Sequence, residues 1–154
     1  MDKTALKIGV KGISAKAGAS FVSYNLDHIL NERGRSRVFV SRPDKYMVTD
    51  SCFEYEDEDV IVGVIDPLPS LLMDGADMIE ELLSLKTPVV WIVNRDNPGV
   101  NRTMMRKYLC FTPEFSQAEV PREIIVRAEY NCLELNELIK LEGIEKLADY
   151  LKVF

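Results

Sequence analysis

The segment 60–65 consists of five apolar residues and one glycine, and Asp66 and Pro67 end it abruptly. Neighbouring side chains of a strand point to opposite faces of the sheet, so a strand that is apolar throughout is covered on both faces. Strands of this kind are typical of parallel sheets that carry helices on both sides. The segment therefore predicts a buried parallel strand in an α/β fold.

The rest of the chain alternates between strand-like and helix-like patterns. Short apolar runs predict strands at 6–10, 38–40, 88–94 and, more weakly, 115–120. Apolar residues at helical spacing predict helices at 20–33, 76–85, 100–109, 133–141 and 143–153. This alternation predicts a three-layer fold, with a mostly parallel sheet and helices on both faces, in which strands 6–10 and 60–65 are central and adjacent.

The size and composition of the chain fit one globular domain, because it has 154 residues, of which 47% are apolar and 29% charged. We therefore expect a single domain over 1–154. The sequence has no long uncharged apolar run of the kind that spans a membrane, and its first residues lack the apolar stretch of a signal peptide. We expect a cytoplasmic protein. Segment 143–154 is amphipathic but mixes acidic and basic residues, so we expect no membrane binding.

The net charge of −6 comes from 25 acidic and 19 basic residues, which argues against a nucleic-acid partner. Segment 50–59 contains no Lys or Arg and carries six acidic residues: Asp50, Glu54, Glu56, Asp57, Glu58 and Asp59. This segment is either a contact for a protein partner or a solvated loop. The one basic cluster consists of Arg33, Arg35, Arg37 and Arg42.

The three cysteines are far apart and form no CxxC pair, so neither a zinc site nor a disulfide framework is indicated.

Ligands of α/β folds bind beyond the carboxyl ends of the strands. Three such ends carry small or polar residues: the loop that follows the first strand, Asp66 and Asn94. The loop contains Gly18 and Ser20, which suit a phosphate-binding turn, but the pattern GxxxxGK[ST] fails, because Ala19 stands where it requires lysine. By itself, the loop also fits a small-residue connection that packs a helix onto the sheet.

The order of these segments resembles the ParA/MinD family, the deviant Walker-motif P-loop ATPases of bacterial partitioning and cell division. That family opens with KGGxGKT and a helix that carries Asn-Leu; residues 14–20 align with the motif without gaps, and Asn25 and Leu26 fall on the pair. Residues 59–67 resemble the family's Walker B strand, which ends in aspartate. Residues 93–101 resemble the strand whose asparagine meets adenine, and residues 120–130 resemble the segment in which the chain leaves a late strand of the family.

The resemblance implies a P-loop NTPase-like fold and, if a nucleotide binds, ATP with Mg²⁺ as the cofactor. The nucleotide-binding residues would then be Lys16, Gly18, Ser20, Asp66 and Asn94, with Mg²⁺ at Ser20 and Asp66 and the base at Asn94. The residues themselves also allow structural roles: Asp66 can cap the turn that follows it, and Asn94 can satisfy loop amides.

Two departures from the family pattern argue against catalysis. The signature lysine that acts across the family's dimer corresponds to Ser14, and the phosphate-gripping lysine corresponds to Ala19. Such a group is commonly worth roughly 10²–10³ in rate, so we expect no ATP hydrolysis, no catalytic residues, no metal and no cofactor. The chain would then be a non-catalytic ParA/MinD-like domain with a degenerate phosphate-binding loop, acting as a protein-interaction or regulatory module, with a homodimer left open.

The alternative is a nucleotide-binding, weakly active ATPase of bacterial partitioning or cell-division positioning, in which Lys16 reaches the phosphates. A dinucleotide-dependent enzyme is disfavoured, because no GxGxxG follows the first strand. The sequence does not identify the protein partner.

Overall fold

The computed structural model describes residues 5–32, 45–50 and 57–154. These residues form one five-stranded sheet in the order β2-β1-β3-β4-β5, and all four strand pairs are parallel. The strands are β1 (Leu6–Gly12), β2 (Tyr46–Thr49), β3 (Val60–Ile65), β4 (Val89–Asp96) and β5 (Phe115–Ala118). The helices are α1 (Ala19–Leu30), α2 (Pro69–Asp74), α3 (Ala76–Leu83), α4 (Arg102–Tyr108), α5 (Arg122–Tyr130), α6 (Leu135–Leu138) and α7 (Glu142–Lys152).

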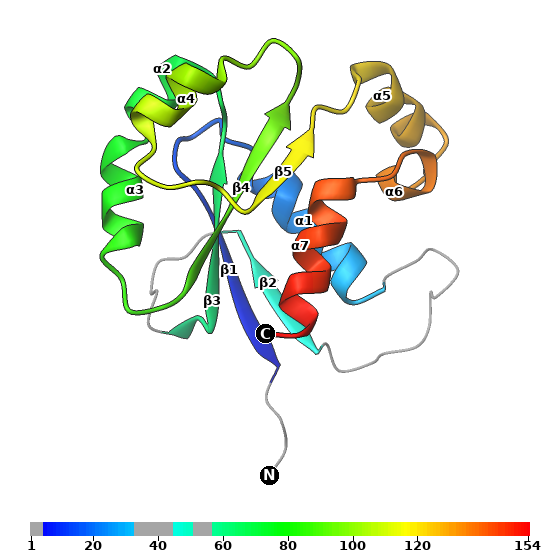
Figure 1. The fold of residues 1–154 in the computed structure, drawn as a ribbon. Helices are drawn as coiled ribbons and strands as arrows, with labels where there is room; N and C mark the ends of the chain where they lie inside the picture. Colours follow the sequence, from blue (N-terminus) through cyan, green and yellow to red (C-terminus); the bar gives the residue numbers. More distant parts are fainter. Residues whose placement is uncertain (1–4, 33–44, 51–56) are drawn as a thin grey trace.

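The sheet lies between two layers of helices (Figure 1). β3 is its middle strand and pairs with β1 on one side and β4 on the other, so the prediction that β1 and β3 are central and adjacent is confirmed. The three-layer α/β fold is confirmed as well. In the ranges 5–32, 45–50 and 57–154, no helix is both long and apolar enough to span a bilayer.

Alternating side chains of β3 reach two separate cores. Val60, Val62 and Val64 belong to a core shared with α1, α5 and α7, whereas Ile61 and Ile65 belong to a core beneath α2, α3 and α4. All six residues of the strand are buried, as its uninterrupted apolar character predicts. Gly63 faces the second core, where a Cβ atom would overlap the ring of the buried Trp91.

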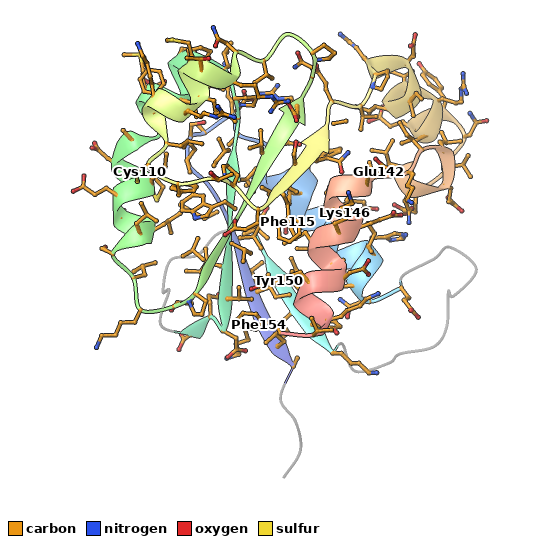
Figure 2. The ribbon with its side chains drawn as sticks, viewed as in Figure 1. Cys110, Phe115, Glu142, Lys146, Tyr150 and Phe154 are labelled. Carbon is orange, nitrogen blue, oxygen red and sulfur yellow. The ribbon has the colours of Figure 1, made fainter. Side chains whose placement is uncertain are left out.

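The last helix, α7, packs its apolar side into the first core through Ile144, Leu147 and Leu151. Figure 2 shows Tyr150 and Phe154 with Phe115 of β5 close by; the ring centroids of Phe115 and Tyr150 are 5.7 Å apart. The terminal amphipathic segment therefore covers one face of the sheet.

Three described elements were missed by the sequence patterns: β2, α2 and α5. β2 has four residues and none of them is fully buried, so it carries little periodic signal. α2 has only six residues, and segment 122–130, which resembles a strand exit, forms a helix after Pro121. The predicted strand at 38–40, the basic cluster and two residues of the acidic segment, Glu54 and Glu56, lie outside the described residues.

Candidate functional site

The loop after β1 returns tightly to the sheet before α1 begins. Ile13 donates a backbone hydrogen bond to the carbonyl of Val64 (3.1 Å), and Ala17 donates one to the carbonyl of Ser14 (3.2 Å). Gly18 precedes α1 with a φ of 91°, a left-handed conformation that glycine adopts without steric cost. Among the described residues no side chain caps α1, so its first backbone N–H groups are left for another partner.

Asn94 ties this loop to β4. Its side chain is buried, with 4% exposure, and its Nδ2 donates to the carbonyl of Ala17 at 3.1 Å. A Cβ atom on Gly18 would overlap the same Nδ2 atom, so the close approach requires glycine there. Asn94 thus serves the loop by donating to a carbonyl, whereas the sequence suggested that it satisfies loop amides.

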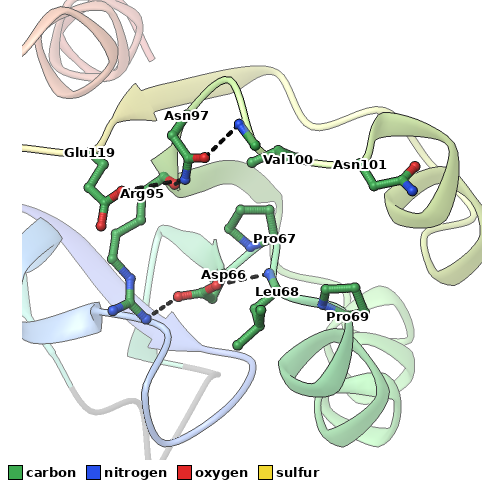
Figure 3. A pocket seen from close by; sticks show the side chains of 10 residues that line it. Asp66, Pro67, Leu68, Pro69, Arg95, Asn97, Val100, Asn101 and Glu119 are labelled. Atoms are coloured by element: carbon green, nitrogen blue, oxygen red, sulfur yellow. Dashed lines mark hydrogen bonds and ion pairs between the residues drawn. The ribbon is translucent and has the colours of Figure 1, made fainter.

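Asp66 follows β3 at the same edge of the sheet and is 4% exposed. Its Oδ1 accepts a hydrogen bond from the backbone N–H of Leu68 at 2.9 Å, which is the capping role predicted from the sequence. Its Oδ2 forms an ion pair with the guanidinium of Arg95 (Figure 3). Both carboxylate oxygens are therefore engaged by groups of the chain itself.

A bulge in β4 places the Arg95 side chain over the loop. The pairing of β4 with β5 shifts register between Val93 and Asp96, and Arg95 adopts a positive φ of 55°. Bulges of this kind redirect a side chain at the end of a strand. The guanidinium Nη2 of Arg95 also donates to the carbonyl of Lys16 at 2.9 Å, so a single cation joins the loop to Asp66.

The structure brings Gly18, Asp66, Asn94 and the backbone of Lys16 together, but Ser20 has a different neighbour. The Ser20 hydroxyl is 3.4 Å from Oδ2 of Asp50, which follows β2. A P-loop Mg²⁺ site needs this hydroxyl and the strand-end aspartate to face one ion. In the structure the two side chains have different partners, Asp50 for Ser20 and Arg95 for Asp66. Elsewhere in the described ranges, no group of three His, Cys, Asp or Glu side chains could hold a metal.

Two cavities lie beside this edge of the sheet. One, of about 390 Å³, is lined by Asp66, Leu68 and Arg95 together with the turn after β4 (Figure 3). The other, of about 380 Å³, lies between the loop and α5 and is lined by ten residues: Lys16, Gly18, Phe21, Asn94, Arg95, Ala118, Glu119, Val120, Arg122 and Ile125. Arg95 belongs to both cavities and stands between them.

Arg95 is the residue of this candidate site that the sequence patterns missed. A signal was nevertheless present: Asp66 directly follows the predicted strand 60–65, Arg95 directly follows the predicted strand 88–94, and the two residues carry opposite charges. The pattern does not reveal the bulge, however, and only the bulge turns the Arg95 side chain toward Asp66.

Comparison with known proteins identifies the fold. No protein-family model matches the chain, and no curated protein matches it in sequence. The chain is similar in structure to the septum site-determining protein MinD complexed with Mg-ADP from Pyrococcus horikoshii OT3, with a TM-score of 0.66, 9% identity and 96% of each chain covered. It is similar to the MinD cell division protein of Aquifex aeolicus, with a TM-score of 0.70, 14% identity, and 97% of this chain and 98% of that chain covered.

A third similar structure is a ParA family ATPase from Chlorobium tepidum TLS, with a TM-score of 0.72, 9% identity, and 96% of this chain and 99% of that chain covered. The chain thus has the fold of MinD and ParA ATPases over nearly its whole length. Identities of 9% to 14% are evidence for the fold alone.

Proposed function

We propose that this chain is a non-catalytic ParA/MinD-like domain with a degenerate phosphate-binding loop, acting as a protein-interaction or regulatory module. The observation that carries the proposal is the ion pair between Arg95 and Asp66. In P-loop ATPases the strand-end aspartate helps to hold Mg²⁺. In this chain the guanidinium of Arg95 supplies the compensating positive charge, and Leu68 donates to the second carboxylate oxygen.

The composition of the loop supports the same proposal. Positions 14 and 19, which align with the two lysines of the family motif, are Ser14 and Ala19. No flexible cation at either position is available to neutralise charge on a transferring phosphoryl group. Lys16 is exposed and lies two residues before Gly18, which precedes α1, and its backbone carbonyl accepts a hydrogen bond from Arg95.

A nucleotide-binding role is the second candidate, and two observations favour it. The uncapped start of α1 presents backbone N–H groups that suit an anion, next to a cavity of about 380 Å³ with three cationic side chains: Lys16, Arg95 and Arg122. In addition, one of the structurally similar proteins, MinD of Pyrococcus horikoshii OT3, is complexed with Mg-ADP. In this role, the chain binds ATP or ADP and hydrolyses ATP weakly or not at all.

Thermal unfolding with and without millimolar Mg-ATP, Mg-ADP or Mg-GTP separates the two candidates. A ligand present at 100 times its Kd stabilises the native state by about 2.7 kcal/mol, a shift of several degrees for a domain of this size. We expect no shift and no phosphate release above background. ATP turnover that is lost in the Asp66→Ala variant would overturn the non-catalytic proposal, and a shift without turnover would favour the second candidate.

The assembly of the protein gives a further test. In the ParA/MinD family that the sequence resembles, the signature lysine acts across a nucleotide-bound dimer. In this chain the aligned residue is Ser14. We expect light scattering to give the same mass with and without Mg-ATP at several protein concentrations. A monomer that becomes a dimer only with ATP would contradict the proposal.

A further inference from the structure

A third cavity lies between α1 and the α5–α6 segment, and it shares Phe21 and Ile125 with the cavity of about 380 Å³ beside the strand ends. It has a volume of about 420 Å³, within the range of small-ligand pockets. Its apolar wall consists of five side chains: Phe21, Ile125, Ala128, Leu133 and Leu135. An apolar cavity of this size can accept the aliphatic part of a side chain from another molecule.

The polar residues around this cavity offer mainly acceptors. Glu129 and Glu134 contribute carboxylates, and no Lys or Arg is among the described residues that line the cavity. Asn25 is 6% exposed and donates its Nδ2 to the carbonyl of Phe21 at 2.9 Å, which leaves its amide oxygen as an acceptor. A complementary ligand therefore carries positive charge and several hydrogen-bond donors.

Tyr24 forms the aromatic rim of the cavity, and hydrogen bonding holds it in place. The hydroxyl of Tyr24 donates to Glu134 Oε2 at 2.7 Å, which links α1 to the start of α6. The Glu134 side chain also accepts from the N–H of the third residue of α6, Glu137, so its position is fixed by two donors. The ring of Tyr24 stacks on His28 with an interplanar angle of 9°, yet 58% of Tyr24 remains exposed.

We propose that this cavity binds an arginine side chain presented by a partner protein. A guanidinium is planar, carries five donors and stacks on aromatic rings, so it suits the Tyr24 rim and the acceptors Asn25, Glu129 and Glu134. The arginine stem then packs on the apolar wall. This inference rests on the proposed role as a protein-interaction domain and identifies a surface for it.

The test uses three acetylated and amidated pentapeptides, Gly-Leu-X-Leu-Gly, in which X is arginine, lysine or citrulline. Each is titrated into the ¹⁵N-labelled full chain, and Kd is obtained from chemical-shift changes. We expect the arginine peptide to shift the Asn25 side-chain signal and to bind about tenfold more tightly than the citrulline peptide, which has the same shape without the charge. The lysine peptide should be intermediate.

Two variants with matched controls locate the binding. Glu129→Gln should weaken the arginine peptide about five- to tenfold, whereas Glu123→Gln, an exposed change on the same helix that does not line the cavity, should have no effect. Tyr24→Ala should weaken binding, whereas Tyr130→Ala, at a tyrosine that is 86% exposed and outside the cavity lining, should not. Thermal unfolding verifies that each variant is folded.

Equal affinity for the arginine and citrulline peptides, no measurable binding of any peptide, or insensitivity to Glu129→Gln would overturn the inference. Self-association that the arginine peptide reverses would also overturn it, because the occupant would then be an arginine of a second copy. None of these outcomes bears on ATP turnover, which is measured separately, so failure of this inference and failure of the non-catalytic proposal are distinguishable.

Discussion

Arg95, at the end of β4, lies against Asp66, at the end of β3, and the same guanidinium group holds the carbonyl of Lys16 in the loop before α1. One side chain therefore connects the three segments that converge at this edge of the sheet. The Asp66 side chain is 5% exposed, whereas that of Arg95 is 47% exposed. The carboxylate consequently depends on this pair more than the arginine does.

Replacing Arg95 should destabilise the protein. Arg95→Ala leaves a buried carboxylate with the N–H of Leu68 as its donor, and we expect the free energy of unfolding in urea to fall by about 1–3 kcal/mol. The matched control is Arg102→Ala, which breaks a 2.7 Å pair with Asp96 nearer the surface and should cost under about 1 kcal/mol. Equal losses in the two variants would show that Arg95 is an ordinary surface partner.

Gly143, in the first turn of α7, should not tolerate alanine. Helix propensity alone favours alanine over glycine by about 1 kcal/mol. A Cβ at position 143, however, would overlap the carbonyl oxygen of Ser116 and lie 2.7 Å from Cα of Gln117. We expect Gly143→Ala to lower the free energy of unfolding by about 1–3 kcal/mol, whereas Asp149→Ala at an exposed site of α7 should change it little. A rise in Tm for Gly143→Ala would contradict this packing.

The stability should depend on pH through Glu58. Burial is the main cause that raises the pKa of Glu58, and Asp57 and Asp59 raise it further against the opposing effects of Lys7 and Thr49. A carboxyl whose pKa is raised in the native state stabilises the fold below its unfolded pKa, and this contribution is lost as the pH rises through the native pKa.

Glu58→Gln should therefore raise Tm at pH 7 relative to the unmodified protein, and the gain should shrink toward pH 4. Thermal unfolding at the two pH values measures the difference. The control Glu80→Gln, at an exposed position on α3, should give the same small change at both. If Glu58→Gln raised Tm more at pH 4 than at pH 7, the predicted direction of the pH dependence would be wrong.

The hydroxyl of Ser14 is buried and has no hydrogen-bond partner among the described residues. Removing an unsatisfied buried hydroxyl relieves a desolvation cost, so Ser14→Ala should leave the free energy of unfolding unchanged or raise it by up to about 1 kcal/mol. Ser116→Ala, by contrast, removes a hydroxyl that donates to Asp96, and urea unfolding should show a loss of about 1 kcal/mol. If Ser14→Ala were the more damaging change, the hydroxyl would have a partner, such as a bound anion, in solution.

The fold and part of the site could be predicted from the sequence because both depend on short-range patterns. The apolar run of β3 predicts a strand covered on both faces, and the alternation of strands and helices predicts a parallel sheet. The carboxyl ends of parallel strands lie at one edge, so Gly18, Asp66 and Asn94 were expected to gather there. They do gather there, and the buried strand β3 pairs with β1 as predicted.

Only the tertiary structure decided how the charges pair. A register shift in β4 turns Arg95 onto Asp66, and the packing of α5 and α6 beside α1 brings Glu134 to Tyr24 across 110 positions of the chain. Periodicity reports which face of an element is apolar, but it contains no information on bulges or on which polar side chains meet across the sheet. For this reason the sequence by itself determined the layers of the fold and the edge of the sheet that carries the site. The folded chain determined the partner of Asp66 and the cavity between α1 and the α5–α6 segment.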